Sequence, residues 1–236
     1  MIQAAAKNSV KGSDLILSVG GDGTILRVAR IVFPLEIPIV GVNFGNLGFM
    51  TELEADEVLD KLPLILDGQG RIESRAMLQS VAKSTGKIYY ALNDIVIGRG
   101  KNVRLVNIKV KINSDLLATY RADAVIVSTA TGSTGYALAA NGPILFPESR
   151  DIILKAVCPH LSLDKAVILK SDTEIKLTAF TNHEAVISMD GQVEESLQNG
   201  EEITVTLSPK VTRFIRLKPE GNFYNTLTSK LKGKSI

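Results

Sequence analysis

The chain has 236 residues, of which 45% are hydrophobic and 22% charged, and its formal net charge is +2. This composition is that of a globular protein large enough for one large domain or two small ones, so it needs no disulfide or metal to hold its core. The net charge creates no global basic field and no apolar run reaches 18 residues, so we expect no nucleic-acid partner and no membrane association.

The N-terminal part of the chain predicts alternating strands and helices. Apolar runs at 14–19 and 37–44 are typical of strands buried on both faces of a parallel sheet. Residues 24–33 carry apolar side chains at helical spacing, and a second helix is predicted over 54–68. We therefore predict an α/β domain over residues 1–73 with a parallel sheet. Only about a dozen residues precede the first strand, so we expect this domain to be shortened at its N-terminus.

The pattern changes near residue 72, after which β-rich runs predominate. The clearest is LVNIKVKIN, in which valines and isoleucines alternate strictly with polar residues. One helix is predicted to begin within 131–142, and 219–231 is interpreted as a short helix or tail. We predict a β-rich, sandwich-like domain over 74–208 and a tail, 209–236, that packs back on the first domain. The active site is expected in the cleft between the two domains.

Cysteine and histidine are scarce. The single cysteine, Cys158, excludes an intramolecular disulfide and is interpreted as a structural residue. His160 and His183 do not share a short spacing, so no metal site built on histidine is expected. The N-terminal MIQAAAKNSV lacks the apolar core of a signal peptide, and we expect a cytoplasmic protein.

The first candidate site is the stretch GGDGT, residues 20–24, between the first predicted strand and helix. Glycines let backbone amides approach phosphate oxygens, and a helix N-terminus adds positive partial charge. A carboxylate at Asp22 would repel phosphate, so it needs a reason of its own. It could hold a Mg²⁺ ion that bridges the phosphates, or it could accept the proton of an attacking hydroxyl. A simple Asp-Gly turn is the alternative.

Two further stretches follow predicted strands or begin them. NFGNLGF, residues 43–49, comes after the second strand, and because successive parallel strands end at one sheet edge, both glycine loops are expected to face one phosphate chain. Asn93 and Asp94 are a neighbouring amide and carboxylate that can bind a ribose diol. A turn at the start of a strand is the alternative for that pair.

The stretch STATGSTGYALAANGP, residues 128–143, leads small hydroxyl and glycine residues into a predicted helix whose N-terminus can face a ligand. Tyr136 could stack on a base or a nicotinamide, and a plain capping loop is the alternative. The stretch has no nucleophile elbow and no histidine partner, which disfavours a serine hydrolase. SMDGQ, residues 188–192, predicts a hairpin turn by itself.

Taken together, these segments resemble the NAD kinase family. GGDGT, GVNFGNLGFMTE, ALNDIVI, ADAVIVSTATGSTGYALAANGPI, CPHLSL and MDGQ occur in that family's order and cover nearly the whole chain. The Asn-Asp pair followed by TGSTGY is the most specific part, because lipid kinases and phosphofructokinases have similar glycine–aspartate signatures. The resemblance implies transfer of the terminal phosphoryl group of ATP, or of polyphosphate, to the adenosine 2′-hydroxyl of NAD. It further implies Mg²⁺ on the phosphates, and a homodimer or homotetramer.

The resemblance also implies roles for individual residues. Asp22 would be the general base. The phosphate-donor loop would contain Gly20, Gly21, Thr24, Asn43, Gly45 and Asn46. The NAD-binding positions would be Gly23, Arg27, Phe49, Asn93, Asp94, Arg104, Arg121, Asp123, Thr134, Gly135, Tyr136, Ala137, Leu138, Ala139 and Gln192. No side chain is assigned as a direct metal ligand.

Two other functions stay open on the sequence. A lipid or sphingoid-base kinase of the same superfamily would need a deep apolar pocket in the β-rich domain in place of the TGSTGY loop. A protein that senses dinucleotides without catalysis is the second alternative. Asp22 argues against it, because binding alone gains nothing from a base beside phosphates.

Overall fold

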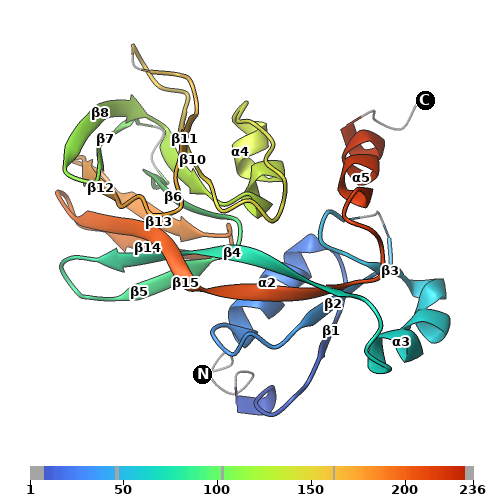
Figure 1. Cartoon of the computed structure of the whole chain (residues 1–236). Coiled ribbons are helices and arrows are strands. Elements are labelled where there is room, and N and C mark those ends of the chain that lie inside the picture. The colour runs from blue at the N-terminus through green and yellow to red at the C-terminus, as the bar shows by residue number, and fades with distance from the viewer. Residues whose placement is uncertain (1–7, 46–47, 102–103, 162, 232–236) are drawn as a thin grey trace. The chain divides into compact units, whose positions relative to one another are not determined.

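The computed structural model describes residues 8–45, 48–101, 104–161 and 163–231, and the chain divides into two compact units (Figure 1). Unit 1 comprises residues 1–75 and 210–236, and unit 2 comprises residues 76–209. The boundaries between them fall within two strands, β4 (Arg71–Ala82) and β15 (Glu202–Arg216). Unit 1 is therefore built from both ends of the chain.

Unit 1 is an α/β structure, as predicted. Its parallel strands are β1 (Ile16–Val19), β2 (Ile39–Asn43) and β3 (Leu53–Glu54), and the last part of β15 pairs in parallel with β2. Its helical elements are α2 (Asp22–Val32), the 3₁₀ turn η1 (Ala55–Glu57), α3 (Val58–Leu66) and α5 (Asn222–Leu231). The buried residues of α2 recur at helical spacing, so one face of the helix is apolar and packs inward.

Unit 2 consists of strands in two sheets. One sheet contains, in spatial order, β15, β12 (Ile175–Phe180), β7 (Val106–Ile112) and β8 (Asp115–Ala122), with β4 pairing to β15 and β5 (Ile88–Ala91) pairing to β4. The other has the order β11 (Val167–Leu169), β10 (Ile152–Val157), β9 (Ala124–Ser128), β6 (Asp94–Arg99), β13 (Ala185–Met189) and β14 (Val193–Leu197). Buried side chains from both sheets form one hydrophobic core, so the predicted layered β structure is confirmed.

The strict alternation seen in the sequence corresponds to β7. Val106, Ile108 and Val110 are buried in the core, and the residues between them point outward. The run LLATYRADAVIVST, in contrast, is not one strand. It divides at Asp123, where the chain leaves β8 in one sheet and enters β9 in the other.

Two expectations need correction. The helix predicted to begin within 131–142 is only a 3₁₀ turn, η2 (Thr131–Thr134), followed by the single α-turn α4 (Tyr136–Ala139). Gly135 separates them because its φ of −100° and ψ of −125° are not helical. The side chain of Cys158, interpreted from the sequence as a structural residue, is exposed. No helix in the described part of the chain combines the length and apolar character needed to cross a bilayer.

Candidate active-site residues

Asp22 is the first residue of α2 and follows the glycine turn that ends β1. Gly20 has a φ of +142°, which residues with side chains rarely adopt, and a Cβ there would lie 2.5 Å from Thr24 Oγ1. The N–H of Gly20 donates to the C=O of Val42 at 2.8 Å, which holds the turn against strand β2. Asp22 thus lies at the positive end of the helix dipole, where a negative side chain is favoured.

Both carboxylate oxygens of Asp22 accept hydrogen bonds from the second glycine loop. Oδ2 accepts from the N–H of Phe49 at 2.9 Å, and Oδ1 accepts from the N–H of Met50 at 3.0 Å. The Asp22 carboxylate therefore connects the first glycine loop to the second by two hydrogen bonds. Each oxygen of an ionised carboxylate has a second lone pair, so Asp22 can still accept a proton from a ligand hydroxyl.

The rest of the second loop is braced internally. Asn43 is buried, its Nδ2 donates to the C=O of Gly45 at 2.8 Å, and its Oδ1 accepts the N–H of Gly45 at 3.2 Å. The Asn43 amide thus already has partners within its own loop. Asn46 lies outside the described residues. The ring of Phe49 has the ammonium of Lys230 4.4 Å from its centroid. Three other predicted residues near Asp22 are exposed on the turn and on α2: Gly21, Gly23 and Arg27.

In unit 2, the Asn93–Asp94 pair stands at the start of β6 and is fixed by Asp190. The Asp190 carboxylate accepts the N–H of Leu92 at 3.2 Å, of Asn93 at 2.7 Å and of Asp94 at 3.3 Å. Asp190 and Gly191 have φ values of 53° and 62° and form the predicted turn between β13 and β14. The sequence predicts the turn but not its role, because no spacing signal links Asp190 to a segment almost 100 residues earlier.

The carbonyl side of the same segment is held by the residues that follow β9. The C=O of Asn93 accepts hydrogen bonds from Ser128 Oγ at 3.1 Å and from the N–H of Thr129 at 2.9 Å, while Thr129 Oγ1 donates to the C=O of Leu92 at 2.6 Å. A Cβ on Gly132 would lie 2.2 Å from the Asn93 carbonyl oxygen, so only glycine fits there. The predicted pair and the TGSTGY loop are thus one packed unit.

A pocket of about 280 Å³ opens beside the Asn93–Asp94 pair, and Tyr136 and Asp190 also line it. Burial, reinforced by the charge of Asp190, raises the pKa of Asp94 to about 7. Among the described residues, the buried Oδ1 of Asn93 has no hydrogen-bond partner. An unpaired acceptor and an acid that titrates near neutrality are a suitable pair for sugar hydroxyls, which both donate and accept.

The remaining predicted residues of the η2–α4 segment differ in exposure. Tyr136 is 43% exposed, whereas Ala137 is fully buried. Burial raises the pKa of the Tyr136 hydroxyl, and the nearby carboxylate of Asp123 adds to this effect. Four more predicted positions are half-buried or exposed beside them: Thr134 at the end of η2, Gly135 between η2 and α4, and Leu138 and Ala139 at the end of α4.

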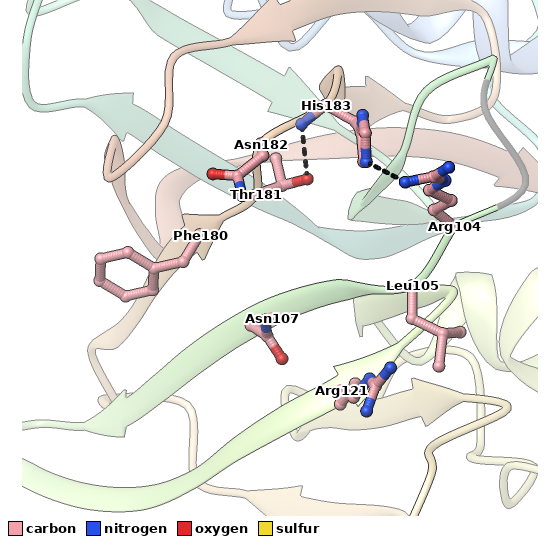
Figure 2. A pocket seen from close by; sticks show the side chains of 8 residues that line it. All are labelled: Arg104, Leu105, Asn107, Arg121, Phe180, Thr181, Asn182 and His183. Carbon is pink, nitrogen blue, oxygen red and sulfur yellow. Dashed lines mark hydrogen bonds between the residues drawn. The ribbon is translucent and has the colours of Figure 1, made fainter.

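Arg104 and Arg121 line a second pocket, of about 420 Å³, together with Asn107, Thr181 and His183 (Figure 2). Arg104 Nη1 lies 3.0 Å from His183 Nε2, and the N–H of His183 donates to Thr181 Oγ1 at 3.1 Å. The other lining residues are Leu105, Phe180 and Asn182, and none of the eight is acidic. The pocket therefore carries positive charge that suits an anionic group.

Asp123 and Gln192 are among the predicted positions that line neither pocket. Asp123 forms an ion pair with Arg99, whose Nε lies 2.7 Å from Asp123 Oδ1, and the N–H of Arg99 donates to the C=O of Asp123. Sequence reasoning did not single out Arg99. Gln192 is half-buried directly after the Asp190–Gly191 turn, and its N–H donates to the C=O of Met189. Within the described ranges, no group of three or more metal-ligating His, Cys, Asp or Glu side chains occurs.

Comparisons with known proteins agree with the motifs. The family model described as the ATP-NAD kinase N-terminal domain matches residues 2–70, and the one described as the ATP-NAD kinase C-terminal domain matches residues 92–217. An NAD kinase of Dehalococcoides mccartyi is 44% identical over 230 residues, covering 96% of this chain and 81% of the relative. An NAD kinase of Chloroflexus aurantiacus is 39% identical over 226 residues, covering 94% and 82%.

Solved structures give the same result. The crystal structure of yeast NADH kinase complexed with NADH matches with a TM-score of 0.89 and 26% identity, over 98% of this chain and 69% of that one. An NAD kinase from Archaeoglobus fulgidus in complex with ATP matches with a TM-score of 0.78 and 27% identity, over 92% and 83%. The resemblance inferred from the motifs is confirmed, and the chain belongs to the NAD kinase family of phosphotransferases.

Proposed function

We propose that this chain transfers the terminal phosphoryl group of ATP to the adenosine 2′-hydroxyl of NAD and so makes NADP, with Asp22 as the general base. The observation that carries the proposal is the Asp22 carboxylate, fixed by two backbone amides at the N-terminus of α2, directly after a glycine turn. Phosphoryl transfer needs positioned phosphates and one acceptor for the hydroxyl proton. Asp22 supplies the acceptor, and the backbone of Gly20 and Gly21 lies beside it.

The bonds formed and broken in the proposed reaction, and the proton that is transferred, can all be accounted for. The 2′-hydroxyl oxygen forms a bond to the γ-phosphorus of ATP, and the bond between that phosphorus and the β,γ-bridging oxygen breaks. The hydroxyl proton passes to Asp22, and ADP leaves with the electron pair of the broken bond. Asp22 later returns its proton to solvent.

The divalent cation is treated as part of the donor substrate. Mg²⁺ is commonly bound by substrate phosphates plus one or two carboxylates and retains several waters. We therefore propose Mg-ATP as donor, with polyphosphate as an alternative donor. When bound, the ion would neutralise the negative charge on the phosphates.

We propose that the pocket of Asn93 and Asp94 holds a ribose of the dinucleotide. The unpartnered Oδ1 of Asn93 would accept a ribose hydroxyl, and Asp94, with a pKa of about 7, can donate or accept at neutral pH. Tyr136 would cover the sugar or its base. Arg104 and Arg121 would add positive charge for the dinucleotide's diphosphate. We also propose that the chain acts in the cytoplasm as a homodimer or homotetramer.

The direct test supplies NAD with Mg-ATP and measures NADP by a coupled assay with an NADP-specific dehydrogenase. Polyphosphate replaces ATP, and NADH replaces NAD, in parallel reactions with the same enzyme preparation. We expect NADP from NAD and Mg-ATP. If folded protein that binds NAD forms no NADP with either donor, the proposed function is wrong.

A further inference from the structure

The backbone amides that hold the Asp22 carboxylate belong to residues 48–51. At one of these residues, Gly48, a side chain would clash with that carboxylate. Gly48 is buried, and a Cβ added to it would lie 2.1 Å from Asp22 Oδ1 and 2.9 Å from its Cγ. The requirement is steric: the missing side chain leaves the volume that the Asp22 carboxylate occupies.

Residues 48–51 also contain an internal hydrogen bond. The N–H of Gly48 donates to Thr51 Oγ1 at 3.2 Å, so a local turn presents the next two amides. Those amides, of Phe49 and Met50, are the donors to the two oxygens of Asp22. Because each oxygen has its own donor, rotation about the Cβ–Cγ bond of Asp22 would break both hydrogen bonds.

A buried cluster of charged residues, Glu73, Arg75 and Arg216, contacts residues 48–51 through the carbonyl group of Met50. Arg216 Nη1 donates to the C=O of Met50 at 2.8 Å, and Arg216 also pairs with Glu73, as does Arg75. Burial alone would raise the pKa of Glu73, but the two guanidinium groups outweigh it and lower this pKa to about 2. Glu73 therefore stays ionised and paired. Met50 is thus bound on both sides, by Asp22 through its N–H and by Arg216 through its C=O.

We propose that residues 48–51 are a positioning device for the general base, in which Gly48 leaves room for the Asp22 carboxylate and Thr51 orients the amides that hold it. This inference rests on the proposed function, in which Asp22 takes the proton. Gly48 and Thr51 do not touch the substrate in this proposal. They act through Asp22, so their loss should lower turnover and leave NAD binding intact. Displacement of a catalytic group by about 1 Å can cost about 10²-fold in rate.

The main test is Gly48→Ala, with Gly221→Ala as the matched control. Gly221 lies in the same unit, and a Cβ there would have nothing within 4 Å. The atom displaced by Gly48→Ala is the end of a side chain, so we expect a folded protein. We expect kcat to fall about 10²-fold, with the KM and Kd for NAD within a factor of two of wild type. A kcat within threefold of wild type would overturn the proposal, as would a loss that appears mainly in NAD binding.

A thermal double-mutant cycle tests the contact without using activity. Gly48→Ala should lower the melting temperature in the wild-type background, by roughly 2–4 °C, because the new methyl group meets the carboxylate. In an Asp22→Ala background that carboxylate is absent, and the same substitution should have no such effect. Equal effects in both backgrounds would show that Gly48 does not act through Asp22. The cycle also separates the two proposals, since it is readable even if the wild-type protein forms no NADP.

A second pair of variants protects the test if Gly48→Ala does not fold. Thr51→Ser retains the hydroxyl that accepts the Gly48 N–H, whereas Thr51→Val keeps the shape and removes the acceptor. We expect Thr51→Val to lower kcat at unchanged NAD affinity and Thr51→Ser to restore most of it. Equal turnover in the two variants would contradict the role assigned to Thr51.

Discussion

The two units use buried carboxylates in opposite ways. In unit 1, Glu73 is surrounded by Arg75 and Arg216, and its pKa is held at about 2. In unit 2, Asp94 is as deeply buried, faces a pocket and another carboxylate, and has its pKa raised to about 7. A carboxylate with full partners supports a structure, whereas a buried one without them is a candidate for contact with a ligand.

A second contrast lies between Asp22 and Asp190. Both carboxylates accept backbone amides from a segment distant in sequence. In unit 1 the segment 48–50 holds Asp22, which we propose does the chemistry. In unit 2 Asp190 holds the segment, and its neighbours Asn93 and Asp94 are the groups proposed to meet the substrate. The same hydrogen-bond pattern therefore fixes the proposed general base in one unit and the proposed binding segment in the other.

The largest effect should come from Asp22→Asn. The amide keeps the shape but is a far weaker base, so we expect kcat to fall about 10²–10⁴-fold while NAD still binds. Steady-state kinetics and calorimetric titration with NAD measure the two parts separately. Asp14→Asn, an exposed site in the same unit, is the control. Normal turnover by Asp22→Asn would show that Asp22 is not the base.

Next in size is the effect of Glu73→Gln on stability. The substitution leaves Arg75 and Arg216 buried without their common counter-charge, and breaking such a pair typically costs about 3–5 kcal/mol. Urea unfolding should show this loss, while Glu220→Gln, at an exposed position of the same unit, should stay near wild type. A loss below about 1 kcal/mol, which is the size typical of exposed ion pairs, would contradict the stabilising role given to Glu73.

The pH dependence of stability should have opposite slopes for the two buried acids. The pKa of Glu73 is lowered from 4.5, so its contribution is complete above pH 4.5 and is lost as the pH falls toward 2. The pKa of Asp94 is raised from 3.8, so its folded form keeps a proton that the unfolded chain releases, and stability falls as the pH rises from about 4 to about 7. Asp94→Asn should remove that fall, on the order of 1–4 kcal/mol, in melting curves at pH 4.5 and pH 8. If the variant shows the same difference in stability between pH 4.5 and pH 8 as the wild type, Asp94 is not the group responsible for that difference.

The smallest expected effect is that of Asp190→Ala on binding. Its loss leaves three backbone amides without their acceptor, so the Asn93–Asp94 segment should lose its fixed position. We expect NAD to bind roughly 10–100-fold more weakly, equivalent to about 1–3 kcal/mol. Glu194→Gln, an exposed charge on the following strand, serves as control. If NAD affinity is unchanged, Asp190 does not position the pair.

Much of this architecture can be predicted from the sequence, because it depends on local patterns. The continuous apolar runs predict both β1 and β2, and the alternation of β7 marks its buried face. Burial on both faces is confirmed for β2 only, because β1 lies at the edge of its sheet and Leu17 and Val19 are exposed. The features that the sequence does not predict are those that depend on contacts between residues distant in the chain. Asp190 looks like an ordinary turn residue until the fold brings it to Leu92–Asp94, and Gly48 shows its reason only beside the Asp22 side chain. The helix predicted to begin within 131–142 is present as α4 but is only four residues long.

The composition of unit 1 from both chain ends has a consequence for biosynthesis. Phe214 is fully buried and pairs with Ile39, and the N–H of Val211 donates to Glu36, which was synthesised 175 residues earlier. A ribosome that has made residues 1–209 has synthesised every segment of unit 2 but has not yet made the part of β15 that pairs with β2 in unit 1. The GGDGT turn therefore waits, exposed to proteases and chaperones, until the last tens of residues emerge. A premature stop after residue 209 would remove the part of β15 that belongs to unit 1 and leave the sequence of the β-rich unit complete.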